Sequence, residues 1–67
     1  MSDLWRGYTE NEQLEFRRSF DGVVLIIRPH ETVPDAWVCV LPDGTRITGE
    51  LPGVQEMVKI TMRARAK

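Results

Sequence analysis

The sequence contains one histidine and one cysteine, so His30 and Cys39 form the only pair that could supply a nucleophile and its base. Cys39 lies in the apolar segment 36–41, where a thiol is usually an inert core residue. No serine, histidine and acid set is convincing, because Ser2 lies at the terminus and Ser19 stands among polar neighbours. We therefore expect a protein that is not an enzyme.

A second candidate for chemistry is the segment 29–35, in which His30, Glu31 and Asp35 occur together. One imidazole and two carboxylates could bind a divalent cation weakly, but they fall short of a closed zinc site with cysteine ligands. Exposed polar side chains of a loop explain the same cluster. The five glycines are scattered, so no phosphate-binding glycine loop is present. We expect neither a metal nor a cofactor.

Positive charge near the end of the sequence is the third candidate. In VKITMRARAK (58–67), apolar or small residues occupy the even positions and hydrophilic residues the odd ones. On an extended strand, this alternation places four cations on one face, namely Lys59, Arg63, Arg65 and Lys67. Such a face could contact an acidic protein or a nucleic-acid backbone, although no aromatic side chains for base stacking lie between the cations. Charges on an edge strand also serve to keep that edge solvated and unpaired.

The N-terminal segment offers a different surface, because Trp5 and Tyr8 flank Arg6 in an otherwise polar stretch. Tryptophan, tyrosine and arginine are enriched at the hot spots of protein–protein interfaces. A chain this short also needs apolar side chains for its core, and we favour that use for Trp5. We therefore predict Trp5, Arg6 and Tyr8 as contact residues of second rank, after the four cations.

An N-terminal helix at 10–20 is the first element that we predict. Thr9 followed by Glu12 matches a capping box, and the acids of this segment precede its arginines, which complements the helix dipole. Gly22 is well placed to end the helix.

A β-hairpin is the alternative for the same segment. A strand over 14–20 would turn at the Asp-Gly pair 21–22 and would place Glu15 opposite Arg28. We adopt the helix because its cap, charge order and propensity agree.

The remaining elements read as strands, and a hairpin is the clearest of them. Pro-Asp-Gly at 42–44 suits a three-residue loop, and that loop places Cys39 opposite Ile47 on one face. Val38 and Val40 then point to the other face, which is half polar and could serve self-association. At the C-terminal end, strict alternation favours a strand over the helical spacing that also occurs there. We predict antiparallel strands at about 23–28, 36–41, 45–51 and 57–66.

Together these elements predict one small domain over 1–67, of the α+β class and mostly β. An N-terminal helix would precede a four-stranded antiparallel sheet, small and barrel-like, comparable with SH3-like or Sm-like barrels by architectural analogy only. No apolar run approaches the roughly 20 residues of a membrane span, no secretory signal is recognisable, and one cysteine cannot form an internal disulfide. We therefore expect a cytoplasmic protein.

The function that we predict is a protein-interaction module, a small regulator or inhibitor that binds a larger protein through its charged strand face. The net charge is −1, but 1–35 carries seven acids and four bases whereas 36–67 carries three acids and five bases. A nucleic-acid-binding small barrel that uses the same cations is the alternative. A further alternative is a self-associating structural subunit, because so short a chain buries little apolar surface. The sequence does not decide whether the protein is a homo-oligomer.

Overall fold

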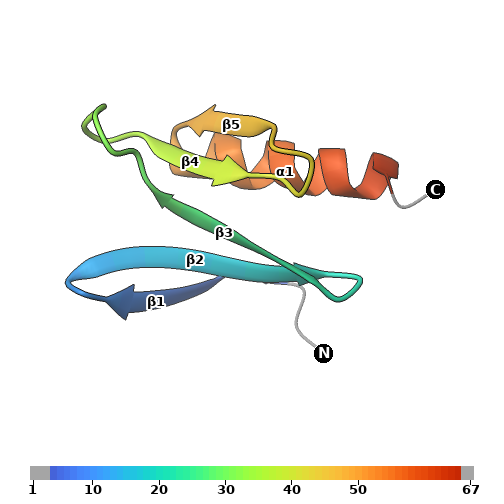
Figure 1. Ribbon diagram of the computed structural model, residues 1–67, viewed down its shortest axis with the longest axis horizontal. Helices are drawn as coiled ribbons and strands as arrows, with labels where there is room; N and C mark the ends of the chain where they lie inside the picture. The colour runs from blue at the N-terminus through green and yellow to red at the C-terminus, as the bar shows by residue number, and fades with distance from the viewer. Residues whose placement is uncertain (1–3, 66–67) are drawn as a thin grey trace.

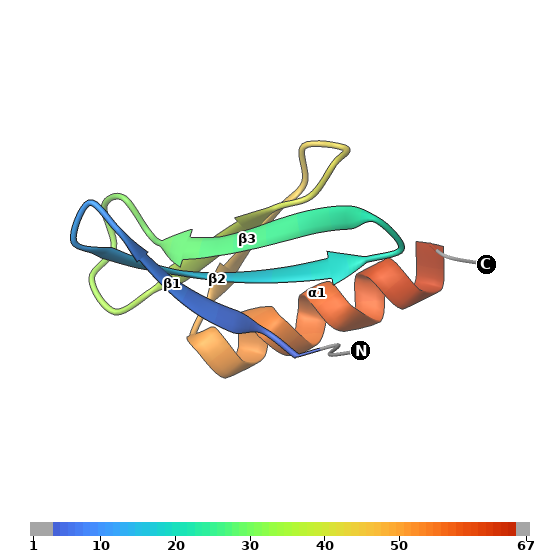
Figure 2. The ribbon, with the colours of Figure 1, turned by 90° about the horizontal axis from the view of Figure 1, so that it is seen from below.

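The computed structural model describes residues 4–65 of the 67-residue chain. Within this range, five antiparallel strands form one open sheet in sequence order, and a helix follows them (Figure 1). The elements are β1 (Arg6–Glu10), β2 (Gln13–Phe20), β3 (Val23–Pro29), β4 (Trp37–Val40), β5 (Arg46–Gly49) and α1 (Leu51–Arg65). The helix lies along one side of the sheet (Figure 2).

The predicted fold class is wrong. The segment 10–20, predicted as an N-terminal helix, contributes to the β1–β2 hairpin, and the predicted four-stranded barrel-like sheet is an open sheet of five strands. Within residues 4–65, the one helix follows the strands instead of preceding them. The comparison with SH3-like and Sm-like barrels therefore does not apply.

The β1–β2 turn explains why the N-terminal helix does not form. Asn11 and Glu12 both adopt positive φ, 53° and 63°, as the two central residues of a type I′ hairpin turn do. The capping-box match is a local signal, whereas a helix here would lack a continuous apolar face. As a strand, the segment directs Phe16 and Phe20 against the core, where tertiary packing outweighs helix propensity.

The hairpin that we weighed as the alternative is correct. Phe16 pairs with Ile27 across β2 and β3, and in the same register Arg28 Nε lies 3.1 Å from Glu15 Oε2. The turn at 21–22 has positive φ at both residues. The strand predicted at 23–28 is present as β3.

The β4–β5 hairpin is confirmed in detail. Its register pairs Cys39 with Ile47, as predicted, and its loop closes through a hydrogen bond from the Leu41 amide to the Thr45 carbonyl at 2.8 Å. Gly44 takes the left-handed conformation with φ 93°, which is what the three-residue loop requires. Turn chemistry alone was sufficient to fix this element.

The strand predicted at 57–66 is wrong, because residues 51–65 form α1. Val54 and Val58 lie one helical turn apart and are 1% and 0% exposed, and Met62 continues their line against the core. Alanine, arginine, lysine and methionine are strong helix formers, so the alternating pattern in 58–67 suits a helix as well as a strand. A helix also satisfies its own backbone groups without a neighbouring strand.

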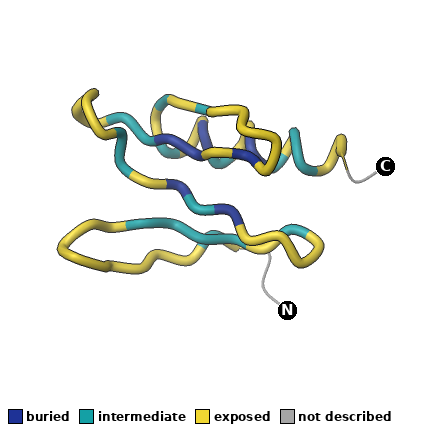
Figure 3. The backbone as a smooth tube through the Cα atoms, in the orientation of Figure 1, coloured by how far each residue is buried: buried dark blue, intermediate teal, exposed yellow. Residues whose placement is uncertain are grey.

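The core lies between the sheet and α1 (Figure 3). Its buried members are Leu25, Ile27, Cys39, Leu41, Val54 and Val58, and its partly buried apolar neighbours are Trp5, Phe16, Phe20, Trp37, Ile47, Leu51 and Met62. Aromatic side chains complete the packing. The ring centres of Phe16 and Trp37 lie 5.5 Å apart in a T-shaped arrangement. Within residues 4–65, no helix has the length and apolar character that crossing a membrane requires.

Candidate functional site

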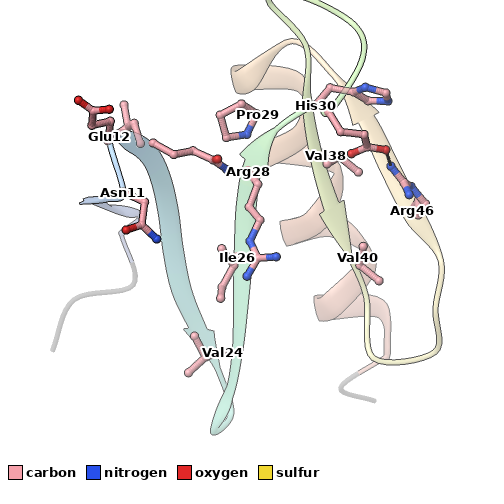
Figure 4. Close-up of a pocket in the computed structure, with 13 residues that line it drawn as sticks. Asn11, Glu12, Val24, Ile26, Arg28, Pro29, His30, Val38, Val40 and Arg46 are labelled. Atoms are coloured by element: carbon pink, nitrogen blue, oxygen red, sulfur yellow. Dashed lines mark hydrogen bonds and ion pairs between the residues drawn. The ribbon is translucent and has the colours of Figure 1, made fainter.

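The candidate site is the face of the sheet that α1 does not cover. Ile27 and Cys39 point toward α1. Because side chains alternate between the two faces of a strand, the residues directly before and after them point to the opposite, uncovered face. Figure 4 shows these side chains on β3, β4 and β5, namely Val24, Ile26, Arg28, Val38, Val40 and Arg46. They border an open hollow of about 880 Å³ that extends to the β1–β2 turn.

The floor of this hollow is apolar. Val24 and Val40 are 58% and 53% exposed, although both belong to strands in the interior of the sheet. Ile26 is half-buried, and Val38 is 7% exposed. Central strands with apolar residues on both faces are typical of sheets that are covered on both sides. In residues 4–65, only one side has a cover.

The rim of the hollow is charged, and its charges are already paired. Arg28 contacts Glu15 at 3.1 Å, and Arg46 Nη2 donates to Glu31 Oε1 at 2.8 Å. The hydrogen bond from Arg46 is the main reason that the pKa of Glu31 lies below its ordinary value. Arg17 contacts two carboxylates at 3.3 Å each, those of Glu10 and Glu15. The uncovered face therefore has little net charge, and each of these arginines already has a carboxylate partner.

The loop between β3 and β4 holds its histidine as a structural brace. His30 Nδ1 accepts hydrogen bonds from the backbone amides of Thr32 and Val33, each at 3.1 Å. The His30 amide in turn donates to the Ala36 carbonyl at 2.8 Å. Within residues 4–65, no three histidine, cysteine or acidic side chains are placed to hold a metal ion, so the cluster of His30, Glu31 and Asp35 does not assemble as a ligand set.

Cys39 lies in the core, as predicted. Its side chain is fully buried, and this burial raises the pKa of the thiol. A thiol with a raised pKa is a poor nucleophile, because the thiolate is the reactive form. The residue acts as a small apolar member of the core.

The three predicted cations within residues 4–65 do not form one row, because they lie on α1 instead of a strand. Lys59 and Arg63 are one helical turn apart, but Arg65 points to a different side of the helix. Lys59 pairs with Glu56 at 3.1 Å, and Arg65 Nη2 donates to Asp43 Oδ2 at 2.7 Å. Lys67 lies outside the described residues. The basic strand face that was predicted to bind a partner is therefore not available as such.

The N-terminal contact residues are divided between the core and the surface. Trp5 packs against the core, with its ring 6.0 Å from that of Phe20, as we favoured. Arg6 and Tyr8 are exposed on the edge strand β1, and the Arg17 guanidinium lies 4.9 Å from the centre of the Tyr8 ring. Their cross-strand partners belong to the uncovered face, so these two side chains extend that face toward the edge of the sheet.

A smaller hollow, of about 300 Å³, lies between the β2–β3 turn and the end of α1. Its walls combine apolar side chains with three arginines, namely Phe20, Val23, Met62, Arg18, Arg63 and Arg65. The Arg18 guanidinium lies 4.6 Å from the centre of the Phe20 ring. In this hollow, Arg18 of β2 lies near Arg63 and Arg65 of α1.

The sequence identified only part of the site. The outward direction of Val38 and Val40 was predicted from the hairpin register, whereas Val24 and Ile26 were missed. The available signal was the unbroken apolar run VVLII at 23–27, since a strand without alternation is apolar on both faces.

No family model, curated protein or solved structure matches this chain significantly.

Proposed function

We propose that the chain is a non-enzymatic interaction module that binds another protein through the uncovered face of its sheet. The observation that supports this proposal is the apolar floor of Val24, Ile26, Val38 and Val40 across the two strands β3 and β4. The partner would present a complementary apolar surface and would leave the paired charges at the rim in contact with water. The chain would then act as a small regulator or inhibitor that occupies a surface on a larger protein.

The size of the face is compatible with such a role. The molecule measures 35 by 24 Å across its two longest axes, and a standard protein interface buries about 800 Å² on each partner. Covering an exposed valine contributes roughly 1.5 kcal/mol, so two such side chains would form an apolar centre for the interface. The rim ion pairs around this centre would add selectivity more than affinity.

A protein partner fits this face better than a nucleic acid does. Phosphate binding relies on unpaired cations, and Arg28 and Arg46 both have carboxylate partners within 3.1 Å. The alternative function, nucleic-acid binding, is best supported by Arg18 and Arg63 of the smaller hollow, because its third arginine, Arg65, is already paired with Asp43. The two functions differ in their response to salt, because phosphate contacts weaken steeply as salt rises.

The test is capture from a cell lysate by the immobilised protein, with nuclease and at low and high salt. The variant combines Val24→Asp with Val40→Asp. Its control is Val33→Asp, which makes the same kind of substitution once, at a valine that is 49% exposed in the β3–β4 loop. We expect the parent and the control to capture the same protein at high salt, and the double variant to fail to capture it. Equal capture by all three chains would contradict the proposal, and capture of nucleic acid at low salt only would support the alternative.

A further inference from the structure

A second apolar stripe lies on α1, on the side that the sheet does not contact. It consists of Gly53, Met57, Ile60 and Ala64, at intervals of four, three and four residues. Met57 and Ile60 are 51% and 52% exposed, although both are large apolar side chains. Intervals of three and four residues are those of the seam in a coiled coil.

The direction of this stripe separates it from the core. At 100° per residue, its centre lies about 130° around the helix from the positions that contact the sheet. Those positions include Val54 and Val58, which are almost fully buried. Figure 2 shows α1 along one side of the sheet, and the exposure of Met57 and Ile60 shows that no described element packs over the stripe. The helix thus has one face in the core and a second apolar face that has no partner within residues 4–65.

The charges beside the stripe indicate what could cover it. Glu56 and Arg63 are seven residues apart, so both lie along the same border of the stripe. In an antiparallel pair of identical helices, this border of one helix meets the same border of the other. Glu56 of each copy then faces Arg63 of its partner, twice in one interface. In a parallel pair the border would instead meet that of Val54 and Thr61, which offers no charge.

The sizes of the stripe residues also suit an antiparallel pair. Met57 of one copy lies against Ile60 of the other at the centre, and Gly53 lies against Ala64 at both ends. A Cβ built at Gly53 would meet no atom within 4 Å, so nothing in the same chain obstructs close approach there. The pair between Glu56 and Lys59 is an exposed one within the helix, and a carboxylate has two oxygens with which to accept a second donor.

We propose that two copies of this chain associate through their α1 helices, packed antiparallel along Gly53, Met57, Ile60 and Ala64. The interface differs from the self-association through Val38 and Val40 that the sequence suggested, because it lies on the opposite side of the sheet. It leaves both uncovered sheet faces free, so a dimer would present its binding face twice. The proposal does not depend on the function of the sheet face.

The test is sedimentation equilibrium from micromolar to millimolar protein, with the fold of each variant checked by circular dichroism. We expect the parent to dimerise and Ile60→Asp to raise the dissociation constant at least about tenfold, whereas Val40→Asp on the sheet face leaves it unchanged. Glu56→Arg and Arg63→Glu should each weaken the dimer, and the chain with both changes should recover it, because the two pairs re-form with reversed sign.

Three results would overturn the proposal. The first is a parent chain that stays monomeric at millimolar concentration. The second is a dimer that Val40→Asp disrupts and Ile60→Asp does not, which would place the contact on the sheet. The third is a double charge reversal that fails to restore what the single changes remove. A monomeric parent that still captures a protein through its sheet face would leave the proposed function intact.

Discussion

Asp43 connects the β4–β5 loop to the end of α1. Its carboxylate accepts a hydrogen bond from the Thr45 amide at 2.9 Å and another from Arg65 Nη2 at 2.7 Å. The hydrogen bonds from Thr45, followed by the contact with Arg65, lower the pKa of Asp43 from 3.8 to about 2. Because this pKa is lower in the folded chain than in the unfolded chain, the ionised group favours folding above pH 3.8.

The first prediction concerns the acid limb of stability. The contribution of Asp43 should be fully present above about pH 4 and should disappear as the pH falls toward about 2. In Asp43→Asn, the group that titrates is removed, so the difference in unfolding free energy between parent and variant should shrink across this interval. Urea unfolding at several pH values measures this difference, and an NMR titration of the parent reports the carboxyl directly. A difference that stays constant from neutral pH to pH 2 would contradict the prediction.

The residues of the candidate site show what sequence reasoning captures at this scale. The direction of Val38 and Val40 followed from a turn whose chemistry is local. The common face predicted for Lys59, Arg63 and Arg65 is wrong, because which side chains share a face depends on whether the segment is a strand or a helix. Which side chains share a face was therefore predicted correctly only where the element that carries them was correct.

Elements differ in how much of their structure is encoded locally. The β4–β5 hairpin was predicted to its register because Pro-Asp-Gly at 42–44 permits few other conformations. The segment 10–20 was predicted as a helix and belongs to a β-hairpin, whereas the segment 57–66 was predicted as a strand and its residues up to 65 belong to α1. In both, short-range signals were ambiguous, and the fold is decided by which arrangement buries Phe16, Val54 and Val58 together.

The β1–β2 turn provides a test at the scale of the element. Glu12 has φ 63° at the second central position of the turn, a conformation that costs an L-residue roughly 1–2 kcal/mol and glycine very little. Glycine also gains freedom in the unfolded chain, which cancels part of this difference. We expect Glu12→Gly to stabilise the protein by about 0.5 kcal/mol, measured by urea unfolding.

The control for this turn is Gly22→Ala at the next one, where φ is 85°. Alanine cannot take that conformation without strain, so this variant should lose roughly 1 kcal/mol. If residues 10–20 were helical, Glu12→Gly would instead destabilise the protein, by about 0.5 kcal/mol, because glycine weakens a helix. The sign of the effect at position 12 therefore distinguishes the hairpin from the helix that the sequence favoured.

At the scale of the whole molecule, burial is unevenly distributed. Ile27, Cys39 and Val58 are 0% exposed and join β3, β4 and α1, whereas every residue of β1 is exposed. This edge strand pairs with β2 alone, and among residues 4–10 it is Trp5 that packs against the core. Figure 3 shows this contrast, because the buried segments lie on β3, the β4–β5 hairpin and α1, whereas β1 is coloured as exposed.

This distribution predicts a gradient of local stability. Opening β1 away from β2 exposes little apolar surface, whereas opening β3 disrupts the core and amounts to global unfolding. We expect the hydrogen-bonded amides of β1 to exchange with solvent about 100-fold faster or more than those of β3 and β4, a ratio that corresponds to ~3 kcal/mol of opening free energy. Hydrogen exchange followed by NMR measures it residue by residue.

The same measurement in Ile60→Asp separates the properties of one chain from those of an assembly. Ile60 is exposed on α1, and α1 packs mainly against β4 and β5, so the gradient should persist when association through the helices is prevented. If β1 amides in the parent were as slow as those of β3, the edge strand would have to be covered in solution. An edge strand exposes a row of unpaired backbone groups, so such protection would indicate that β1 pairs with a strand of another chain. The edge of the sheet at β1, and neither α1 nor the uncovered face, would then be the interface.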